Sequence, residues 1–289
     1  MSYLGKFTGV IALALAGQLL GAPSAQALPD TSDNKIQIIQ HNPDMVGPQA
    51  AMQAAAEWDG GVDAITFQEL CKSQVADLTA VGYRVHWRQQ RAAGRTGDTR
   101  TCRKGNAIAS VHAFSSTSVH TLMTRGTGGQ KRVFKLLCVN LKGTGVAKTT
   151  VCTSHFPLDY NAKNKAPSGE QNRISVANKI RGIVNPKITA GRRVVLTGDF
   201  NDSPKSTPLD RFYKVKGNGR FWEGDQKCGK KKVCRAMAPT TDTGRSLDYF
   251  FASSPGVNKL SGVSKLPVPQ YDMVGHYVVR GSVKFGPLR

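Results

Sequence analysis

The sequence predicts an α/β sandwich whose β-sheets are mixed. Segments with the residue pattern of β-strands outnumber the helical segments, and the helical segments are few and well separated. A turn at Gly143-Thr144-Gly145 joins two β-rich segments into a hairpin, which requires antiparallel pairing. This pattern favours a sandwich over a doubly wound parallel sheet, in which strands and helices alternate.

The individual elements follow from the periodicity of apolar residues and from the turn residues between them. Strands are predicted at residues 35–41, 62–67, 83–87, 106–111, 115–123, 132–141, 148–155, 193–196, 247–251 and 277–283. A helix is predicted at residues 49–58, which are rich in alanine and are followed by Gly60-Gly61. A second helix is predicted at residues 171–184, because Ile174, Ala177 and Ile180 recur on one face.

The first 27 residues have the features of a signal peptide. Lys6 precedes an apolar stretch, and Ala25-Gln26-Ala27 supplies the small residues that signal peptidase recognises. The apolar stretch is short and contains glycine and glutamine, which argues against the alternative of a retained membrane anchor. We therefore expect residues 1–27 to be removed and residues 28–289 to be secreted as a single catalytic domain, a monomer with no stable membrane insertion.

All six cysteines lie after the predicted cleavage site. An even number of cysteines in an exported chain indicates disulfides, and the lack of any Cys-x-x-Cys pair argues against the alternative of a zinc site. One pair lies on the two arms of the predicted hairpin, a second pair brackets a short loop, and the two remaining cysteines are left for each other. The predicted disulfides are therefore Cys71–Cys102, Cys138–Cys152 and Cys228–Cys234.

The charge of the chain is strongly positive and unevenly distributed. Lys and Arg number 40 against 19 Asp and Glu, which gives a formal net charge of +21. Many of the basic residues gather at residues 84–104 and 214–235. Such a protein attracts polyanions, which include nucleic acid, anionic lipid surfaces and acidic polysaccharide. Within the first cluster, we expect Arg91, Arg95 and Arg100 to bind the substrate.

Polar residues that can carry chemistry follow several of the apolar strands. They are Asn42, Gln68-Glu69, His155, Asp199 and Asn201, and two more, Asp248 and His276, lie near the end of the chain. Carboxylate and amide oxygens suit Mg²⁺ or Mn²⁺, and histidines supply proton transfer or hydrogen bonds to phosphoryl oxygens. The set is typical of metal-assisted phosphodiester hydrolysis. A covalent serine route has no support, because the chain has no Gly-x-Ser-x-Gly motif.

Four short motifs carry a resemblance to a known family. They are Phe67-Gln68-Glu69, Thr197-Gly198-Asp199-Phe200-Asn201, Leu247-Asp248-Tyr249 and His276-Tyr277. In these motifs and their order, the sequence resembles the endonuclease/exonuclease/phosphatase superfamily, which includes deoxyribonuclease I, the catalytic subunit of cytolethal distending toxin and bacterial sphingomyelinases. The resemblance extends from Asn42 to Val283 and implies a four-layer α-β-β-α sandwich.

The resemblance also implies a role for each residue. Glu69 is expected to bind the divalent metal with Asn42 beside it, and the metal is expected to be Mg²⁺, with Mn²⁺ or Ca²⁺ as alternatives. Asp199 is expected to orient or deprotonate the attacking water, or to touch the metal. His155 and Asn201 are expected to contact the phosphate. Asp248 is expected to pair with His276.

The sequence departs from the family pattern at one position. Members normally have Ser-Asp-His before the last strand, and that Asp supports the metal site. Here the residue before His276 is Gly275. Either Asp272 reaches the metal from the preceding loop, or the site has one carboxylate fewer.

Three functions are compatible with these features. The first prediction is a secreted metal-dependent nuclease, an endonuclease that hydrolyses DNA, because clustered positive charge supplies nonspecific affinity for nucleic acid. A second is a secreted phospholipid phosphodiesterase similar to sphingomyelinases, for which Phe221-Trp222 is the candidate membrane contact. A third is a catalytically weakened module that binds polyanions.

Overall fold

The computed structural model describes residues 34–44, 47–90, 102–126, 132–143, 145–158, 169–224, 235–253, 257–263 and 275–286. The predicted signal peptide lies outside these residues, so cleavage and secretion stay predictions. Within the described ranges, no helix has the length and apolar character that are needed to cross a membrane.

The helices are α1 (Gln49–Ala56), α2 (Val75–Ala80) and α3 (Gly169–Thr189). Short 3-10 helices span Lys72–Gln74 and Leu209–Arg211. The strands are β1 (Lys35–His41), β2 (Ala64–Cys71), β3 (Arg84–Gln89), β4 (Lys104–Ser110), β5 (Ala113–Arg125), β6 (Arg132–Lys142), β7 (Thr149–His155), β8 (Arg193–Asp199), β9 (Phe221–Glu223), β10 (Asp248–Ser253), β11 (Val257–Val263) and β12 (Val279–Phe285).

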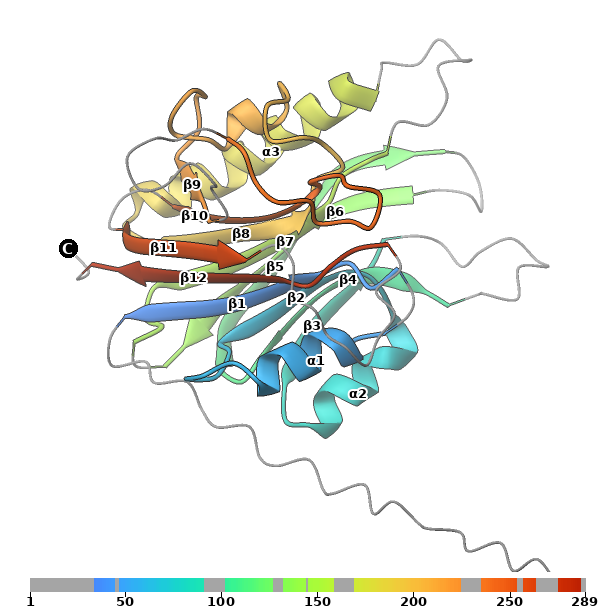
Figure 1. The fold of residues 1–289 in the computed structure, drawn as a ribbon, viewed down its shortest axis with the longest axis vertical. Coiled ribbons are helices and arrows are strands. Elements are labelled where there is room, and N and C mark those ends of the chain that lie inside the picture. The colour runs from blue at the N-terminus through green and yellow to red at the C-terminus, as the bar shows by residue number, and fades with distance from the viewer. Residues whose placement is uncertain are drawn as a thin grey trace, which may run out of the picture.

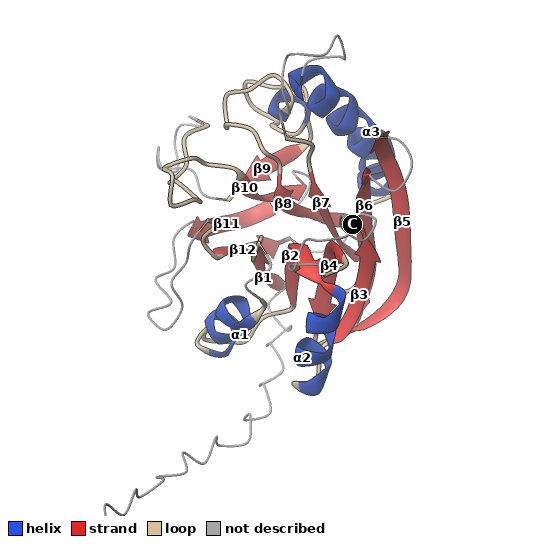
Figure 2. Ribbon diagram, turned by 90° about the vertical axis from the view of Figure 1, so that its right-hand side faces the viewer, coloured by secondary structure: helices blue, strands red, loops and turns tan. Residues whose placement is uncertain are grey.

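Within the described residues, the strands form two six-stranded sheets that pack face to face (Figure 1). One sheet has the order β11-β12-β1-β2-β4-β3, and the other has the order β5-β6-β7-β8-β10-β9. Each sheet contains one parallel pair, β1 with β2 and β7 with β8, and its other pairs are antiparallel. Helix α3 covers the outer face of one sheet, and α1 and α2 cover the outer face of the other (Figure 2). The predicted α-β-β-α sandwich with two mixed sheets is thereby confirmed.

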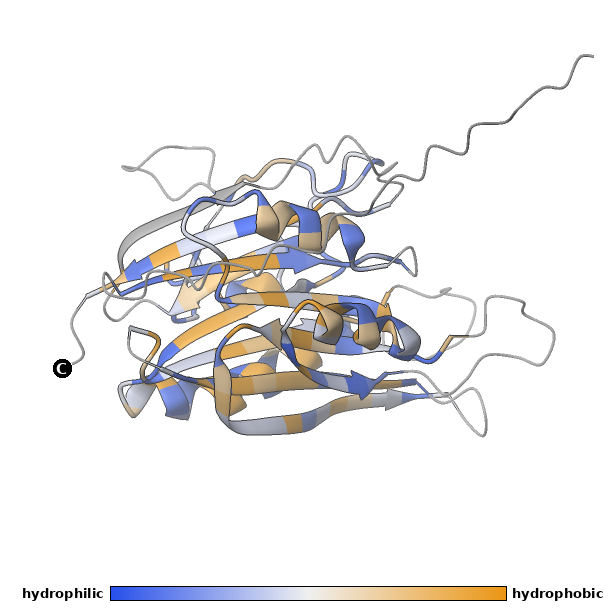
Figure 3. Ribbon diagram, turned by 90° about the horizontal axis from the view of Figure 1, so that it is seen from below, coloured by the Kyte–Doolittle hydropathy of each residue, from blue (hydrophilic) through white to orange (hydrophobic). Residues whose placement is uncertain are grey.

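Three apolar layers hold this arrangement together (Figure 3). Between the sheets, Ile38, Val195 and Phe250 belong to a buried layer of side chains from both inner faces. Outside, α3 packs on its sheet through Val176 and Ile180, and the alanines of α1 pack on the other sheet. Burial of this apolar area, at about 25 cal/mol per Å², is the main stabilising contribution, and it fixes the strand ends that carry the polar residues.

Both parallel pairs end at the same edge of the sandwich. His41 at the end of β1 pairs with Phe67 of β2, and His155 at the end of β7 pairs with Asp199 at the end of β8. Strand β12 runs antiparallel to β1, so the C-terminus that follows β12 lies at the opposite end of the sheet from this edge (Figure 1). The carboxyl ends of parallel strands are where open α/β sheets gather ligand-binding residues.

Several elements differ from the sequence-based predictions. Glu69 and Asp199 were expected in loops that follow strands, but both lie within strands, because β2 and β8 end four and three residues later than predicted. Helix α3 was expected to end before Pro186, but it continues to Thr189, which buries Ile188 against the core. Helix α2 and strands β9 and β11 were not predicted.

Two of the three predicted disulfides are present. Cys138 and Cys152 face each other across β6 and β7, where they are directly paired in the ladder. The Cys71–Cys102 bond ties the end of β2 to the segment that enters β4. Cys228 and Cys234 lie outside the described residues, so their pairing stays a prediction.

Buried His86 makes the stability of the fold sensitive to acid. Burial lowers the pKa of His86 from 6.5 to about 4, with a smaller contribution from the charge of Arg88. Between these two values the unfolded chain binds a proton that the folded chain does not, so the free energy of unfolding falls as the pH is lowered from 6.5 to 4. The slope for one histidine is at most about 1.4 kcal/mol per pH unit.

Urea unfolding between pH 4 and 7 tests this contribution. As the pH is lowered, the free energy of unfolding should fall less steeply for His86→Leu than for the wild type. Equal slopes in the two proteins would contradict this assignment.

Candidate active site

Asp199 lies at the centre of the polar edge, at the last position of β8. Gly198 before it has φ of 147°, and a Cβ at this position would lie 2.0 Å from the carbonyl oxygen of Ser154. Only glycine therefore allows β7 and β8 to approach closely at this point. Asn201 has φ of 50°, a left-handed conformation that turns the chain sharply after the strand. The local backbone thus accounts for Gly198 and favours asparagine at position 201.

Three side chains surround one oxygen of Asp199. Its Oδ2 accepts a hydrogen bond from Asn42 Nδ2 at 2.9 Å, and lies 3.4 Å from His155 Nε2 and 3.7 Å from His276 Nε2. Its Oδ1 accepts a hydrogen bond from the backbone N–H of Asn201. Burial raises the pKa of the Asp199 carboxyl above its ordinary value, although His276 and His155 act in the opposite direction. A carboxylate with a raised pKa and polar neighbours is suited to accept a proton.

His276 is held by a buried carboxylate. Its Nδ1 lies 2.8 Å from Asp248 Oδ2, which also accepts a hydrogen bond from Thr240 Oγ1, and Gln40 Nε2 donates to Asp248 Oδ1. Burial alone would lower the pKa of His276, but the charges of Asp248 and Asp199 outweigh it and raise the pKa to about 10. His276 is therefore an imidazolium at neutral pH, and it can donate hydrogen bonds to negatively charged oxygens.

Glu69 forms a second acidic centre beside the first. A β-bulge between Phe67 and Leu70 interrupts the pairing of β2 with β4, and Glu69 takes φ of 54° within it. Its carboxylate forms an ion pair with Lys104 Nζ, which lies 3.2 Å from Asp44 Oδ1, and Glu69 Oε1 lies 3.9 Å from His155 Nδ1. Burial by itself raises the pKa of Glu69, but His155 and Lys104 outweigh it and lower the pKa to about 2.

The residues around Glu69 fit a divalent cation. Glu69 and Asp44 provide carboxylate oxygens, Asn42 provides an amide oxygen, and the Lys104 ammonium already places a positive charge between the two carboxylates. Oxygen donors of this kind suit hard ions such as Mg²⁺, Mn²⁺ or Ca²⁺.

A second group, Asp199, Asp248 and His276, has potential ligand atoms within 4.8 Å of one another. The oxygens of Glu69 and Asp44 are more accessible than those of this group. Asp248 has no exposed surface, and both of its oxygens already accept hydrogen bonds. The charges of Asp248 and Asp199 raise the pKa of His276, which favours a protonated ring over the neutral imidazole that binds a metal.

The structure brings together most of the residues that the sequence indicates. Asn42, Glu69, His155, Asp199, Asn201, Asp248 and His276 share one edge. The side chain of Asn201 was expected to hold a phosphate oxygen, whereas its Nδ2 donates to the carbonyl oxygen of Phe156 at 3.0 Å. Arg91, Arg95, Arg100 and Asp272 lie outside the described residues, so their roles stay predictions.

Asp44 and Lys104 were not predicted as members of the site. Asp44 lies two residues after Asn42, and its backbone N–H donates to Asn42 Oδ1, so the Asn-Pro-Asp spacing was a usable signal. Lys104 was counted among the basic residues at 84–104. Its contact with Glu69 spans 35 residues of sequence, and no local pattern indicates it.

A cavity of about 190 Å³ opens beside these residues. Its lining combines the charged side chains of Glu69, Lys104, Arg132 and His155 with apolar surface from Phe134 and Leu158. The cavity therefore offers positive charge and apolar contact directly next to the acidic centre.

Solved structures with the same architecture support the fold assignment. The human Nocturnin catalytic domain, described with a bound sulfate anion, has 13% sequence identity and a TM-score of 0.67, and the match covers 90% of this chain and 96% of that one. An endonuclease/exonuclease/phosphatase from Beutenbergia cavernae has 15% identity and a TM-score of 0.60, with 88% and 72% covered. Truncated TDP2 from Caenorhabditis elegans has 14% identity and a TM-score of 0.55, with 86% and 97% covered.

At these identities the likeness shows the fold alone. No curated protein is significantly similar to the chain in sequence. The model of the Endonuclease/Exonuclease/phosphatase family matches residues 21–282, which is most of the chain. The motifs at the polar edge and the two-sheet sandwich agree with that match, and the chain belongs to the Endonuclease/Exonuclease/phosphatase family.

Proposed function

We propose that this chain is an exported, divalent-metal-dependent nuclease that hydrolyses phosphodiester bonds of DNA. Members of its family are typically hydrolases of phosphodiester bonds and generally use divalent metals. The geometry around Asp199 is the main support for the proposal. Asn42, His155 and His276 surround one oxygen of this buried carboxylate. The carboxylates of Glu69 and Asp44, which both contact Lys104, lie at the same edge.

The residues have complementary roles in this proposal. Asp199 accepts the proton of the attacking water, since burial raises its pKa. The His276 imidazolium and the Asn42 amide donate hydrogen bonds to phosphoryl oxygens, whose negative charge grows in the transition state. Asp248 keeps His276 protonated and oriented. Glu69, Asp44 and Asn42 would hold a divalent ion, which we take to be Mg²⁺ or Mn²⁺ and which would supply charge neutralisation at a phosphate oxygen.

Charge favours nucleic acid as the substrate class. The net charge is +21, and Lys104 and Arg132 line the cavity beside the acidic centre. Neutralisation of backbone phosphates supplies most of the nonspecific affinity for DNA. The sulfate anion of the human Nocturnin structure supports the idea that this fold holds tetrahedral anions.

The phospholipid alternative is less well supported. Its candidate membrane contact was Phe221-Trp222, but Phe221 is only 1% exposed and belongs to the apolar core. Trp222 lies under the ammonium of Lys214, which is 5.3 Å from the ring centre. Phe221 is therefore not placed to enter a lipid bilayer.

The proposal also includes export, and it includes a monomeric state as predicted from the sequence. The signal-like features of residues 1–27 support export, and the Cys71–Cys102 and Cys138–Cys152 disulfides suit an oxidising compartment.

Salt dependence of DNA binding tests the proposed substrate. Arg132→Ala should weaken the binding of unrelated DNA sequences about equally, and should reduce the slope of log affinity against log salt by about one unit. The slope is measured by fluorescence anisotropy across a salt titration without metal. Lys148→Ala is the control, because exposed Lys148 precedes β7 at the end opposite His155. A chain that fails to bind DNA even at low salt would contradict the proposal.

A further inference from the structure

Lys104 occupies the position at which a metal ion would be expected. Its ammonium pairs with Glu69 and lies 3.2 Å from Asp44 Oδ1. The side chain is only 14% exposed, and the Glu69 side chain is 22% exposed. A lysine at the surface of a protein usually keeps its ammonium in water. Here the ammonium is drawn inward between two carboxylates, one of which is a proposed metal ligand.

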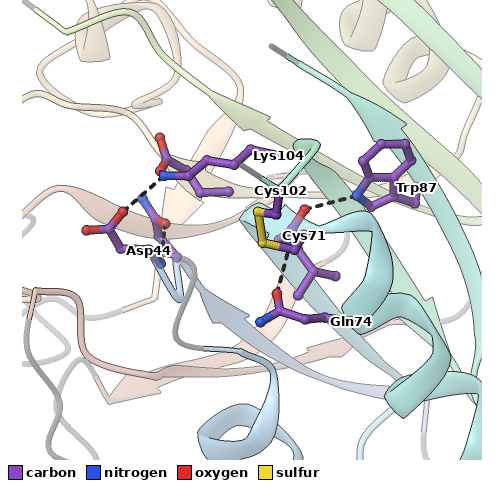
Figure 4. The surroundings of a disulfide bond; sticks show 9 residues. Asp44, Cys71, Gln74, Trp87, Cys102 and Lys104 are labelled. Atoms are coloured by element: carbon purple, nitrogen blue, oxygen red, sulfur yellow. Dashed lines mark hydrogen bonds and ion pairs between the residues drawn. A yellow bond between two sulfur atoms is a disulfide. The ribbon is translucent and has the colours of Figure 1, made fainter. Parts of the chain in front are cut away.

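The backbone holds Lys104 in this place. Lys104 is the first residue of β4 and pairs with Cys71 of β2, two residues after Glu69. The Cys71–Cys102 disulfide ties the segment before Lys104 to the same strand end (Figure 4). The backbone N–H of Lys72 also donates to the carbonyl oxygen of Arg103. The backbone positions of Lys104 and Glu69 are therefore fixed relative to each other, which keeps the two side chains within reach.

We propose that Lys104 is a tethered cation that competes with the divalent metal for the Glu69–Asp44 carboxylates. The proposal rests on the metal site described above. Without metal, the ammonium offsets the repulsion of the two carboxylates. When a divalent ion binds Glu69, Coulomb repulsion drives the Lys104 ammonium away from the shared carboxylates. The exchange of one ion pair for another lowers the apparent metal affinity.

This competition sets the metal concentration at which the site is filled. Lys104 is covalently present at a high effective concentration, whereas the metal must bind from solution, so an empty site is stabilised at low metal. The flexible four-carbon chain of the lysine lets its ammonium move from the carboxylates toward the neighbouring cavity, which Lys104 also lines.

Direct metal titration tests the proposal without substrate. The full mature chain is stripped of metal, and Mn²⁺ binding is measured by calorimetry at neutral pH and by the electron paramagnetic resonance signal of free Mn²⁺. The variants are Lys104→Met, which removes the charge and keeps the length, and Lys104→Gln as a second neutral replacement. Lys135→Met is the matched control, because the Lys135 ammonium donates to the backbone carbonyl of Gln89 rather than to a carboxylate.

We expect Lys104→Met and Lys104→Gln to bind Mn²⁺ about 10- to 100-fold more tightly than the wild type, since one competing charge is removed. Metal-free Lys104→Met should also melt at a lower temperature than the wild type, and Mn²⁺ should raise its melting temperature by more. Lys135→Met should bind Mn²⁺ like the wild type. Equal or weaker Mn²⁺ affinity in both Lys104 variants, or no binding by any of the proteins, would overturn the proposal. Tighter Mn²⁺ binding by the Lys104 variants, in a protein that cleaves no DNA, would contradict only the nuclease assignment.

Discussion

Asp199→Asn is expected to lower the turnover number for DNA cleavage by about a thousandfold. The substitution keeps the size of the side chain but removes the carboxylate that accepts the proton of the attacking water. It also weakens the charge that faces His155 and His276. The turnover number is measured with supercoiled plasmid at saturating Mg²⁺, together with the melting temperature of the variant.

Asp202→Asn is the matched control for this loss. Asp202 lies three residues after Asp199, and its carboxylate accepts a hydrogen bond from Arg173 Nε at 2.7 Å. This change should lower the melting temperature and leave the turnover of the folded protein close to that of the wild type. Wild-type turnover in Asp199→Asn would remove Asp199 from the chemistry.

His276→Ala is expected to reduce turnover by about a hundredfold to ten-thousandfold, because it removes a charged donor to the phosphoryl oxygens. The pH profile gives a sharper test. Burial opposes the charge of His276, but Asp248 and Asp199 raise its pKa to about 10, so the wild type should keep its activity until the pH approaches 10. Asp248→Asn removes the charge that contributes most to raising the pKa of His276, whereas burial still lowers this pKa. The alkaline fall in kcat/KM should therefore move to lower pH.

The comparison at two pH values separates this electrostatic role from a structural one. Asp248→Asn should lose more activity at pH 8.5 than at pH 6, whereas general destabilisation should not depend on pH in that direction. An unchanged alkaline limb in Asp248→Asn would show that Asp248 does not set the charge of His276.

Much of the candidate site could be predicted because strand ends converge. Each of Glu69, His155 and Asp199 lies at or near the end of an apolar strand, and the parallel pairs of the two sheets bring these ends to one edge. Sequence order and hydrophobic pattern were therefore sufficient to place them together. The Cys138–Cys152 bond was predictable for the same reason, because the turn between β6 and β7 fixes their register.

The elements that were missed depend on contacts that no local pattern records. Strand β11 contains Lys259, Ser261 and Gly262, which give a weak strand pattern, and it exists through its pairing with β12. Helix α2 is only six residues long, and Leu78 is its buried residue. The pairing of Lys104 with Glu69 requires the register of β2 with β4 and the disulfide beside it. Residues that act through such long-range contacts become visible only in the folded chain.

The most direct measurement exposes the purified mature chain to supercoiled plasmid, RNA and sphingomyelin vesicles, each with Mg²⁺ and with EDTA. We expect plasmid cleavage that requires Mg²⁺, stops with EDTA and disappears in Glu69→Gln. Release of phosphocholine from the vesicles without plasmid cleavage, or plasmid cleavage that continues in EDTA, would contradict it.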